Sequence, residues 1–402
     1  MDRGLLEKLK RHEVSFHEID KILDPDTAIK LRRTAVSELT GASLSHTGDF
    51  TLDLEKVTKR NIENMIGAVQ IPLGIAGPLH IKGEYAKGDF YLPLATTEGA
   101  LVASVDRGSS VITAGGGANA RIFDDKMTRA PVFRANSIIG AKSLIDWVSS
   151  NFIRLKECAE KTTRFGKLLS VEPFIAGRSV YLRFSYDTKD AMGMNMATIA
   201  TDSAVDLILS ENDVELIALS GNMCTDKKPS AVNVILGRGK TVSSDVIIST
   251  DTIHEKLKTT PSKMFEVNYR KNLLGSARAV SLGFNAHAAN IAAAMFIACG
   301  QDAAHVVEAS TAITNMEIVE EGLYCSVTIP SLPVGTVGGG TGIGAQHECL
   351  SILGVGGAGD PPGVNAKKLA EIIAAAVLAG EISLIGALAA RHLAKAHAKL
   401  GR

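Results

Sequence analysis

The spacing of apolar residues separates helical from extended segments in the first part of the chain. Apolar residues recur with helical periodicity over residues 28–40, within a charge-rich stretch at residues 1–60, and predict a helical N-terminal segment. Proline and glycine become frequent at residues 71–94, a pattern typical of strands joined by tight turns. Residues 97–110 return to helical spacing, so we expect a helix to follow these strands.

The middle of the chain mixes both patterns. A helical stretch at residues 137–159 precedes a β-rich run at residues 179–186, and the block ends in a second helical stretch at residues 203–209. Residues 131–218 therefore predict a small α+β domain inserted in a larger one.

Two alanine-rich runs dominate the last part of the chain. They cover residues 286–298 and 366–400, and each predicts a long helix. The longest uninterrupted apolar stretches, residues 291–299 and 372–380, are shorter than the roughly 18 residues that a membrane-spanning helix needs. Residues 1–20 have no apolar signal-peptide core, so we expect a cytoplasmic protein.

The composition indicates a globular protein with a large core. Of 402 residues, 46% are hydrophobic and 21% are charged, and this length suggests two or three domains. Basic and acidic residues number 43 each, so no net field attracts nucleic acid or an anionic membrane. The five cysteines are scattered without a CxxC pair, which favours reduced thiols and disfavours structural zinc. We therefore expect a small-molecule substrate.

Glycine-rich strings match nucleotide-binding patterns only in part. GVGGAG at residues 354–359 fits GxGxxG, but the sequence DPP follows it instead of a helix start, so we reject a Rossmann fingerprint. Looser matches begin at Gly115 and Gly340, outside any evident βαβ unit. GKT at residues 239–241 resembles the end of a P-loop, but Val234 occupies the position of its required glycine. A nucleoside triphosphatase is disfavoured.

Four ionisable residues in weakly polar sequence are candidates for chemistry. Glu98 enters an apolar helix start, where it either caps the helix or, if buried, donates a proton. Lys227 lies in a predicted loop at residues 220–229, as part of a solvated turn or facing a reacting oxygen. Asp302 follows an apolar helix and would require a partner such as lysine if buried. His397, on the final helix, could simply complement the helix dipole.

An ordered series of motifs decides between these alternatives. The motifs are ENMIG at 63–67, IPLGIAGPL at 71–79, ATTEG at 95–99, DAMGMN at 190–195, SGNMCTDKKP at 220–229, GQD at 300–302 and GTVGGGT at 335–341. In this order they resemble the hydroxymethylglutaryl-coenzyme A (HMG-CoA) reductase family over residues 63–397. The resemblance is to the NADPH-dependent class I type, in a soluble, archaeal-like form without the membrane-anchoring region of eukaryotic members.

The resemblance implies a two-step, four-electron reduction of HMG-CoA to mevalonate and coenzyme A, with NADPH as cofactor. Lys227 would stabilise the oxyanion in both hydride steps, and Asp302 would hold Lys227 in place. Glu98, with a raised pKa, would donate a proton to the aldehyde oxygen. His397, on a mobile C-terminal helix, would protonate the departing thiolate of coenzyme A.

The resemblance also implies binding residues. Those for the HMG carboxylate and its surroundings are Arg129, Ser220, Asp226, Lys228, Lys271 and Asn290, because an anionic acyl group needs several convergent donors. Arg107 and His287 match positions near coenzyme A, although Asp106, beside Arg107, departs from the animal pattern. The cofactor residues are Arg164 for the 2′-phosphate, together with Asp190, Met192, Gly193, Met194, Asn195, Gly338, Gly339 and Gly340.

The fold implied by the resemblance is α+β. Its parts are an N-terminal helical segment (1–62), a large helix-rich HMG-CoA-binding domain with a central long helix and sheet (63–130 and 219–402), and an inserted ferredoxin-like, non-Rossmann NADPH-binding domain (131–218). Family members are homodimers or dimers of dimers with sites at the subunit boundary, so we expect this assembly. We expect no metal, nucleic acid or membrane partner.

Two other classes of protein remain as alternatives. An acyl-coenzyme A-binding protein or transferase without redox activity would not need Arg164 or the turn at residues 190–195. A non-catalytic structural subunit would have no reason to bury a charge such as Asp302, because burial of an unpaired charge is costly.

Overall fold

The longest apolar helix forms the centre of the larger core. In the computed structural model, which describes residues 2–390, this helix is α15 (Val364–Ala389), and it is buried on all sides over most of its length. Within the described residues it is long and apolar enough to cross a membrane, but 83% of its most apolar window is buried inside the protein. A helix that is hydrophobic all round belongs in a core or a membrane, and this one is a core helix.

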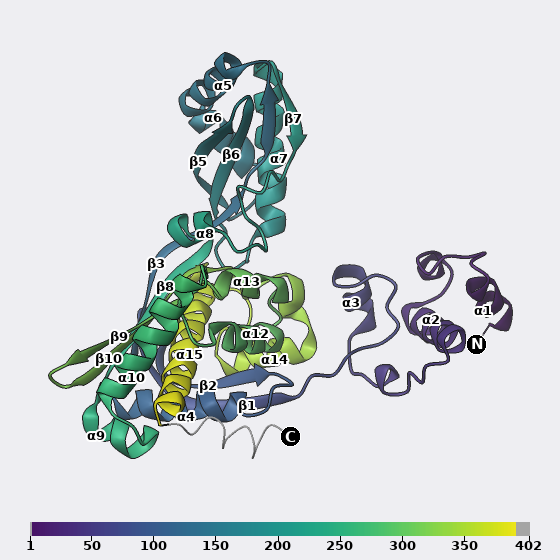
Figure 1. Cartoon of the computed structure of the whole chain (residues 1–402). Helices are drawn as coiled ribbons and strands as arrows, with labels where there is room; N and C mark the ends of the chain where they lie inside the picture. Colours follow the sequence, from purple (N-terminus) through teal and green to yellow (C-terminus); the bar gives the residue numbers. More distant parts are fainter. Residues whose placement is uncertain (1, 391–402) are drawn as a thin grey trace.

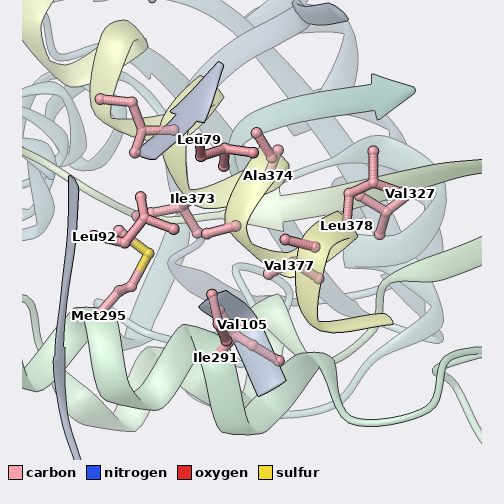
Figure 2. Packing of buried hydrophobic residues seen from close by; sticks show 14 of the residues in the cluster. Leu79, Leu92, Val105, Ile291, Met295, Val327, Ile373, Ala374, Val377 and Leu378 are labelled. Atoms are coloured by element: carbon pink, nitrogen blue, oxygen red, sulfur yellow. The ribbon is translucent and has the colours of Figure 1, made fainter. Parts of the chain in front are cut away.

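A mixed sheet supports α15. Its strand order is β2-β1-β3-β8-β10-β9, with antiparallel pairs except between β1 and β3. The strands are β1 (Leu73–Gly83), β2 (Lys87–Ala95), β3 (Ala118–Arg129), β8 (Gly239–Ser249), β9 (Ile313–Val319) and β10 (Gly322–Leu332). Helices α4 (Leu101–Ala114) and α12 (Ala288–Ala298) pack against α15. Figure 2 shows side chains from these elements meeting around Ile373 and Val377.

A second sheet forms a unit with its own core, drawn at the top of Figure 1. Its antiparallel order is β7-β4-β6-β5, and helices α5, α6 and α7 belong to it. The bounds are β4 (Val132–Ala135), α5 (Ile138–Ser150), α6 (Phe152–Glu160), β5 (Lys167–Ala176), β6 (Ser179–Asp187), α7 (Met194–Glu211) and β7 (Val214–Ala218). Strand β3 joins both sheets, because its last residues, Met127 to Arg129, pair with β6.

The N-terminal residues form a helical segment with separate small cores, as predicted. Its helices are α1 (Arg3–Lys10), α2 (Pro25–Thr40) and α3 (Leu54–Arg60), and an extended stretch connects them to β1 in Figure 1. The carboxylate of Asp24 accepts a hydrogen bond from the N–H of Thr27 and starts α2. Buried Arg32 donates to the carbonyl oxygens of Phe16 and Met65, which holds the segment together.

Short helices complete the connections between these elements. They are α8 (Ala231–Leu236), α9 (Thr250–Thr252), α10 (Pro261–Val267), α11 (Ser276–Arg278), α13 (Val306–Ala309) and α14 (Gly344–Ile352).

Three predicted helix boundaries are wrong. The helix predicted at residues 97–110 starts at Leu101, because Ala100 adopts a left-handed φ of 72° and breaks the helical backbone. The stretch at residues 137–159 is two helices interrupted at Asn151. The stretch at residues 203–209 belongs to the longer α7, and the block ends in β7, which pairs with β4. The helix predicted at residues 366–400 is confirmed as far as Ala389, and residues 391–400 lie outside the described residues. The other predicted strands and helices are confirmed within residues 2–390.

Close packing of α4 against α15 yields a prediction about stability. A Cβ on Gly108 would lie 1.9 Å from the carbonyl oxygen of Ala379, a backbone atom that has little room to move. Gly108→Ala should therefore destabilise the protein by about 1–3 kcal/mol, the usual effect of overpacking a core. The measurement is the unfolding midpoint in urea. The control is Gly344→Ala, since nothing lies within 4 Å of a Cβ there. Equal midpoints for the two variants would contradict the prediction.

Candidate active site

The central residue of the candidate site, Lys227, lies in an irregular loop between β7 and α8. The predicted loop at residues 220–229 is confirmed, and Asn222, Thr225 and Lys227 in it have φ values of 63°, 49° and 57°. Non-glycine residues seldom adopt this left-handed conformation, so the loop is strained at three places. Strain of this kind is typical of functional sites.

The Lys227 ammonium forms an ion pair with Asp302. Lys227 Nζ lies 2.7 Å from Asp302 Oδ2, as predicted from the sequence. Asp302 also accepts a hydrogen bond from the N–H of Ala304, which starts a short helical turn after α12. The hydrogen bond to Asp302 raises the pKa of Lys227. Partial burial alone would raise the pKa of Asp302, but the hydrogen bonds from Lys227 and from the N–H of Ala304, together with nearby positive charge, outweigh it, and the pKa is lowered. Both groups are therefore ionised at neutral pH.

This ion pair faces a cleft of about 1060 Å³. Cleft-lining residues from the predicted site are Lys227, Asp302, Asp226, Arg129, Met192, Gly193, Met194, Asn195, Gly338, Gly339 and Gly340. They come from the end of β3, from the start of α7 and the turn before it, from the loops that carry Lys227 and Asp302, and from the loop before α14. The cleft therefore lies beside the end of β3, the strand that joins the two sheets. Arg60, the last residue of α3, and Asn61 line it as well. The volume suits a large organic ligand.

Glycine backbone forms one wall of the cleft. Nothing lies within 4 Å of a Cβ built on Gly338 or Gly339, and both have positive φ values. Gly193, which precedes α7, has a φ of 98°. A Cβ on Gly335 would lie 2.3 Å from the backbone nitrogen of Met192, so the two turns are in contact. An open glycine backbone beside a helix start allows close approach of a phosphate-bearing ligand.

Asp190 points away from the cleft. Its Oδ2 accepts hydrogen bonds from the N–H groups of Gly359 and Gly363, and its Oδ1 accepts one from Ala366. The residue is only 3% exposed, and two of these donors, Gly363 and Ala366, belong to the start of α15. Its carboxylate therefore caps the core helix, while its backbone carbonyl accepts a hydrogen bond from Thr336 beside the glycine wall.

Several predicted residues lie around the opposite end of α12. Glu98 accepts a hydrogen bond of 2.8 Å from the side-chain amide of Asn290 in the first turn of α12, and His287 precedes that turn. Asp302 follows the other end, so α12, roughly 16 Å long by its 1.5 Å rise per residue, separates Glu98 from the ion pair within one chain. Glu98 is exposed on a loop, contrary to the prediction that it lies in a helix.

Two cationic residues belong near this end of α12. Burial lowers the pKa of Lys271, and the neighbouring Glu381 carboxylate only partly offsets this. Arg107 donates to the hydroxyl and carbonyl oxygens of Ser383 on α15. Asp106, beside Arg107, accepts a hydrogen bond from the N–H of Gly77, at the irregularity within β1.

The remaining predicted residues lie outside the lining of the cleft or outside the described chain. Ser220 contacts the sulfur of Cys224, and Lys228 donates to the backbone carbonyl of Asp226. Arg164 is exposed on the loop before β5, where a Cβ on Gly166 would meet the cleft residue Met196. His397 lies outside the described residues 2–390.

A buried polar cluster beneath Lys227 was missed by sequence reasoning. It consists of Arg238, Glu308 and His305, all 0% exposed, together with Asp226. Asp226, His305 and Glu308 have the spacing of metal ligands, but the Arg238 guanidinium already donates to both carboxylates and supplies the positive charge. One feature of the sequence could have indicated this cluster. Glu308 lies in the same apolar sequence that made Asp302 suspicious.

The arrangement suits an enzyme that acts on a carbonyl group. A fixed ammonium held by a carboxylate stabilises negative charge on a reacting oxygen, and the glycine-walled cleft beside it accommodates a large cofactor or substrate. The family model for hydroxymethylglutaryl-coenzyme A reductase matches residues 28–402. The chain belongs to this family.

Named proteins of similar sequence support this family assignment. The chain is 56% identical to the 3-hydroxy-3-methylglutaryl-coenzyme A reductase of Pyrococcus abyssi over 403 residues, with 99% of each chain covered. It is 54% identical to that of Haloferax volcanii, again with 99% of each covered. It is 44% identical to 3-hydroxy-3-methylglutaryl-coenzyme A reductase 1 of Dictyostelium discoideum, covering 99% of this chain and 73% of that protein.

Solved structures share the fold. The class II 3-hydroxy-3-methylglutaryl-CoA reductase of Streptococcus pneumoniae, solved bound to NADPH in open conformations, matches with a TM-score of 0.66 and 18% identity. The match covers 93% of this chain and 100% of that one. The expected mixed helix-and-sheet fold is thereby confirmed.

The position of Asp190 leads to a test of its role. Asp190→Asn should lower the urea unfolding midpoint and reduce the free energy of unfolding by about 1–3 kcal/mol. The reason is that the amide nitrogen of asparagine cannot accept the hydrogen bonds that a carboxylate oxygen accepts from buried N–H groups. The matched control is Asp206→Asn, an exposed aspartate on α7. If Asp190→Asn instead weakens ligand binding while keeping the midpoint of the control, Asp190 is a direct ligand contact.

Proposed function

We propose that this protein is an HMG-CoA reductase, which reduces (S)-HMG-CoA to (R)-mevalonate and coenzyme A by way of mevaldyl-CoA and mevaldehyde. The observation that carries the proposal is the Lys227–Asp302 pair at the edge of the glycine-walled cleft. Such a pair suits a reaction in which a carbonyl oxygen gains negative charge twice. The identity of 56% to a named reductase supports it.

Each proposed catalytic residue has a distinct task. In both reductions Lys227 stabilises the oxyanion that forms as the carbonyl carbon accepts a hydride, and Asp302 orients the lysine. The hemithioacetal then breaks its carbon–sulfur bond, and His397 protonates the leaving thiolate. Glu98 donates the proton that converts the second oxyanion into the hydroxyl of mevalonate, which requires a neutral carboxyl group in the assembled site.

NADPH is the proposed cofactor, and it supplies the two hydrides. The described residues fit it, because Gly338 and Gly339 leave open space at the cleft wall and Gly193 precedes a helix start. We propose that Met192, Gly193, Met194, Asn195 and Gly338 to Gly340 hold its pyrophosphate and nicotinamide portions. Arg164 pairs with the 2′-phosphate, and Asp190 acts indirectly by fixing the turn.

The proposed domains follow from this division of tasks. The unit at residues 131–218 is a ferredoxin-like NADPH-binding domain, supported by its antiparallel order β7-β4-β6-β5 and its separate core. The large HMG-CoA-binding domain comprises residues 63–130 and 219–402, and residues 1–62 form the N-terminal segment.

The proposed substrate contacts form two groups. Arg129, Asp226, Ser220 and Lys228 lie near or in the cleft and serve the HMG group; the Nε atom of Arg129 is buried without a partner among the described residues. Lys271, Asn290, His287 and Arg107 gather near the start of α12 and serve the HMG carboxylate and coenzyme A of the same or a neighbouring site.

We propose that the protein is of class I. The support is sequence distance: identity is 44% to the Dictyostelium relative and 18% to the class II structure. A cytoplasmic location is proposed because the only helix of spanning length among residues 2–390 lies in the core.

The assembly we propose is a homodimer or dimer of dimers. Glu98 and Lys227 lie at opposite ends of α12 in one chain. A twofold arrangement that brings the Glu98 end of one subunit to the cleft of its partner would complete each site.

The reaction itself can be tested by stoichiometry. Purified protein should consume two NADPH for each coenzyme A released from HMG-CoA, measured by absorbance at 340 nm and a thiol reagent, because thioester-to-alcohol reduction takes four electrons. Absence of NADPH consumption would remove the proposed function. A ratio of one would indicate that the aldehyde leaves unreduced.

Mixing inactive subunits tests the shared site. Glu98→Gln and Lys227→Ala should each lack measurable steady-state turnover as homodimers. When they are unfolded together at equal amounts and reassembled, half the dimers should be mixed with one intact site each, which restores about a quarter of wild-type activity for a twofold dimer. The control is the same treatment of Lys227→Ala with Asp302→Asn, which should restore nothing since both residues serve the same site from the same chain. Equal recovery in both mixtures would contradict a shared site.

A further inference from the structure

The backbone at Lys227 needs an external restraint. Its φ of 57° is left-handed, a conformation that is unfavourable for a residue with a Cβ. Such strain persists only where the surroundings over-determine it. A relaxed backbone would swing the side chain of Lys227 away from Asp302, because φ sets the direction of the Cα–Cβ bond.

Glu308 supplies a restraint directly at this residue. Its Oε1 accepts the backbone N–H of Lys227 at 2.7 Å from α13. The same oxygen accepts a hydrogen bond from Arg238 Nη1 at 3.0 Å, and both Glu308 and Arg238 are 0% exposed. Hydrogen bonds to a buried carboxylate are stronger than those between neutral groups, so this contact suits a strained position.

Arg238 extends the restraint to the preceding residue. Its Nη2 donates to Asp226 Oδ1 at 2.8 Å, so one guanidinium bridges Asp226 and Glu308 on either side of the peptide that enters Lys227. Arg238 is itself held between Gly237 and Gly239, which have φ values of 72° and 77°. A Cβ on Gly239 would lie 2.5 Å from the carbonyl oxygen of Leu332, so this backbone is fixed against β10.

We propose that Glu308, clamped by Arg238, is a positioning residue that holds Lys227 in the left-handed conformation required for its ion pair with Asp302. This inference rests on the function proposed above, in which Lys227 stabilises the oxyanion in both reductions. Glu308 contacts the backbone of Lys227 and not its ammonium, so its effect is geometric. It is fully buried and does not line the cleft.

Kinetics of two Glu308 variants test the proposal. Glu308→Ala should lower kcat about 10- to 100-fold for both HMG-CoA and mevaldehyde, because small misplacements of a catalytic group have effects of this size. KM for HMG-CoA should change less than about 3-fold, since the substrate contacts remain. Glu308→Gln keeps an oxygen that accepts the Lys227 N–H and should retain most of the activity lost in Glu308→Ala.

The matched control is Glu371→Gln. Glu371 is equally buried and accepts backbone hydrogen bonds from Glu84, Tyr85 and Ala86, far along the chain from the cleft loop. It should lower the unfolding midpoint while kcat per folded protein stays within about 2-fold of wild type, as expected for a purely structural contact.

Measurements in a Lys227→Ala protein separate a positioning role of Glu308 from general damage to the fold. In Lys227→Ala, addition of Glu308→Ala should not reduce the residual single-turnover rate further, because Glu308 acts through Lys227. A further reduction equal to that in the wild-type background would overturn the proposal, as would a Glu308→Ala variant with kcat within about 2-fold of wild type.

The geometry can be checked without activity. In a crystal structure of Glu308→Ala, the Lys227 Nζ to Asp302 Oδ2 separation should exceed about 4 Å, the limit of an ion pair, in place of 2.7 Å. An unchanged separation would overturn the proposal. Wild-type protein without NADPH consumption would remove the proposed function, while this separation would still report on the role of Glu308.

Discussion

Buried carboxylates that accept backbone hydrogen bonds fix the core helix α15 to the rest of the protein. Asp190 caps its first residues, Glu371 within it accepts three N–H groups from the β1–β2 turn, and Glu381 accepts those of Ala286 and His287. A buried charge without partners would be very costly, but oriented N–H donors offset that cost. Each contact therefore permits only one relative placement of the segments that it joins.

The site inherits its geometry from these contacts. Glu381 fixes the segment that leads into α12, and a rigid helix carries that placement to its other end, where Asp302 follows. Asp190 fixes the turn that precedes α7, and the backbone of this turn is hydrogen-bonded to Thr336 beside the glycine wall. The Lys227–Asp302 pair and the glycine-lined wall of the cleft are thus both positioned relative to α15, although they come from segments far apart in sequence.

The sequence correctly predicted those features that depend on local patterns of residues. The β1–β2 hairpin, α2, α12 and the loop that carries Lys227 follow from periodicity and turn residues, and the pairing of Asp302 with Lys227 followed from the motifs. Glu98 was misplaced because a left-handed Ala100 delays the helix, and no propensity signals such a backbone. The cap formed by Asp190 joins residues over 160 positions apart in sequence, so only the folded chain reveals it. Glycine counts gave no useful signal because packing and ligand approach both require glycine.

The left-handed backbone of Lys227 explains why several buried groups hold this residue in place. A lysine on a helix or strand would need no clamp, but its direction would be set by the regular backbone and by packing of its neighbours. A left-handed residue in a loop can be aimed independently of both, at the cost of strain that other groups must offset. Arg238 and Glu308 offset it from beneath, where they are screened from water, while the side chain of Lys227 remains 43% exposed. The buried polar cluster and the strained loop therefore act together to orient the ammonium group of Lys227.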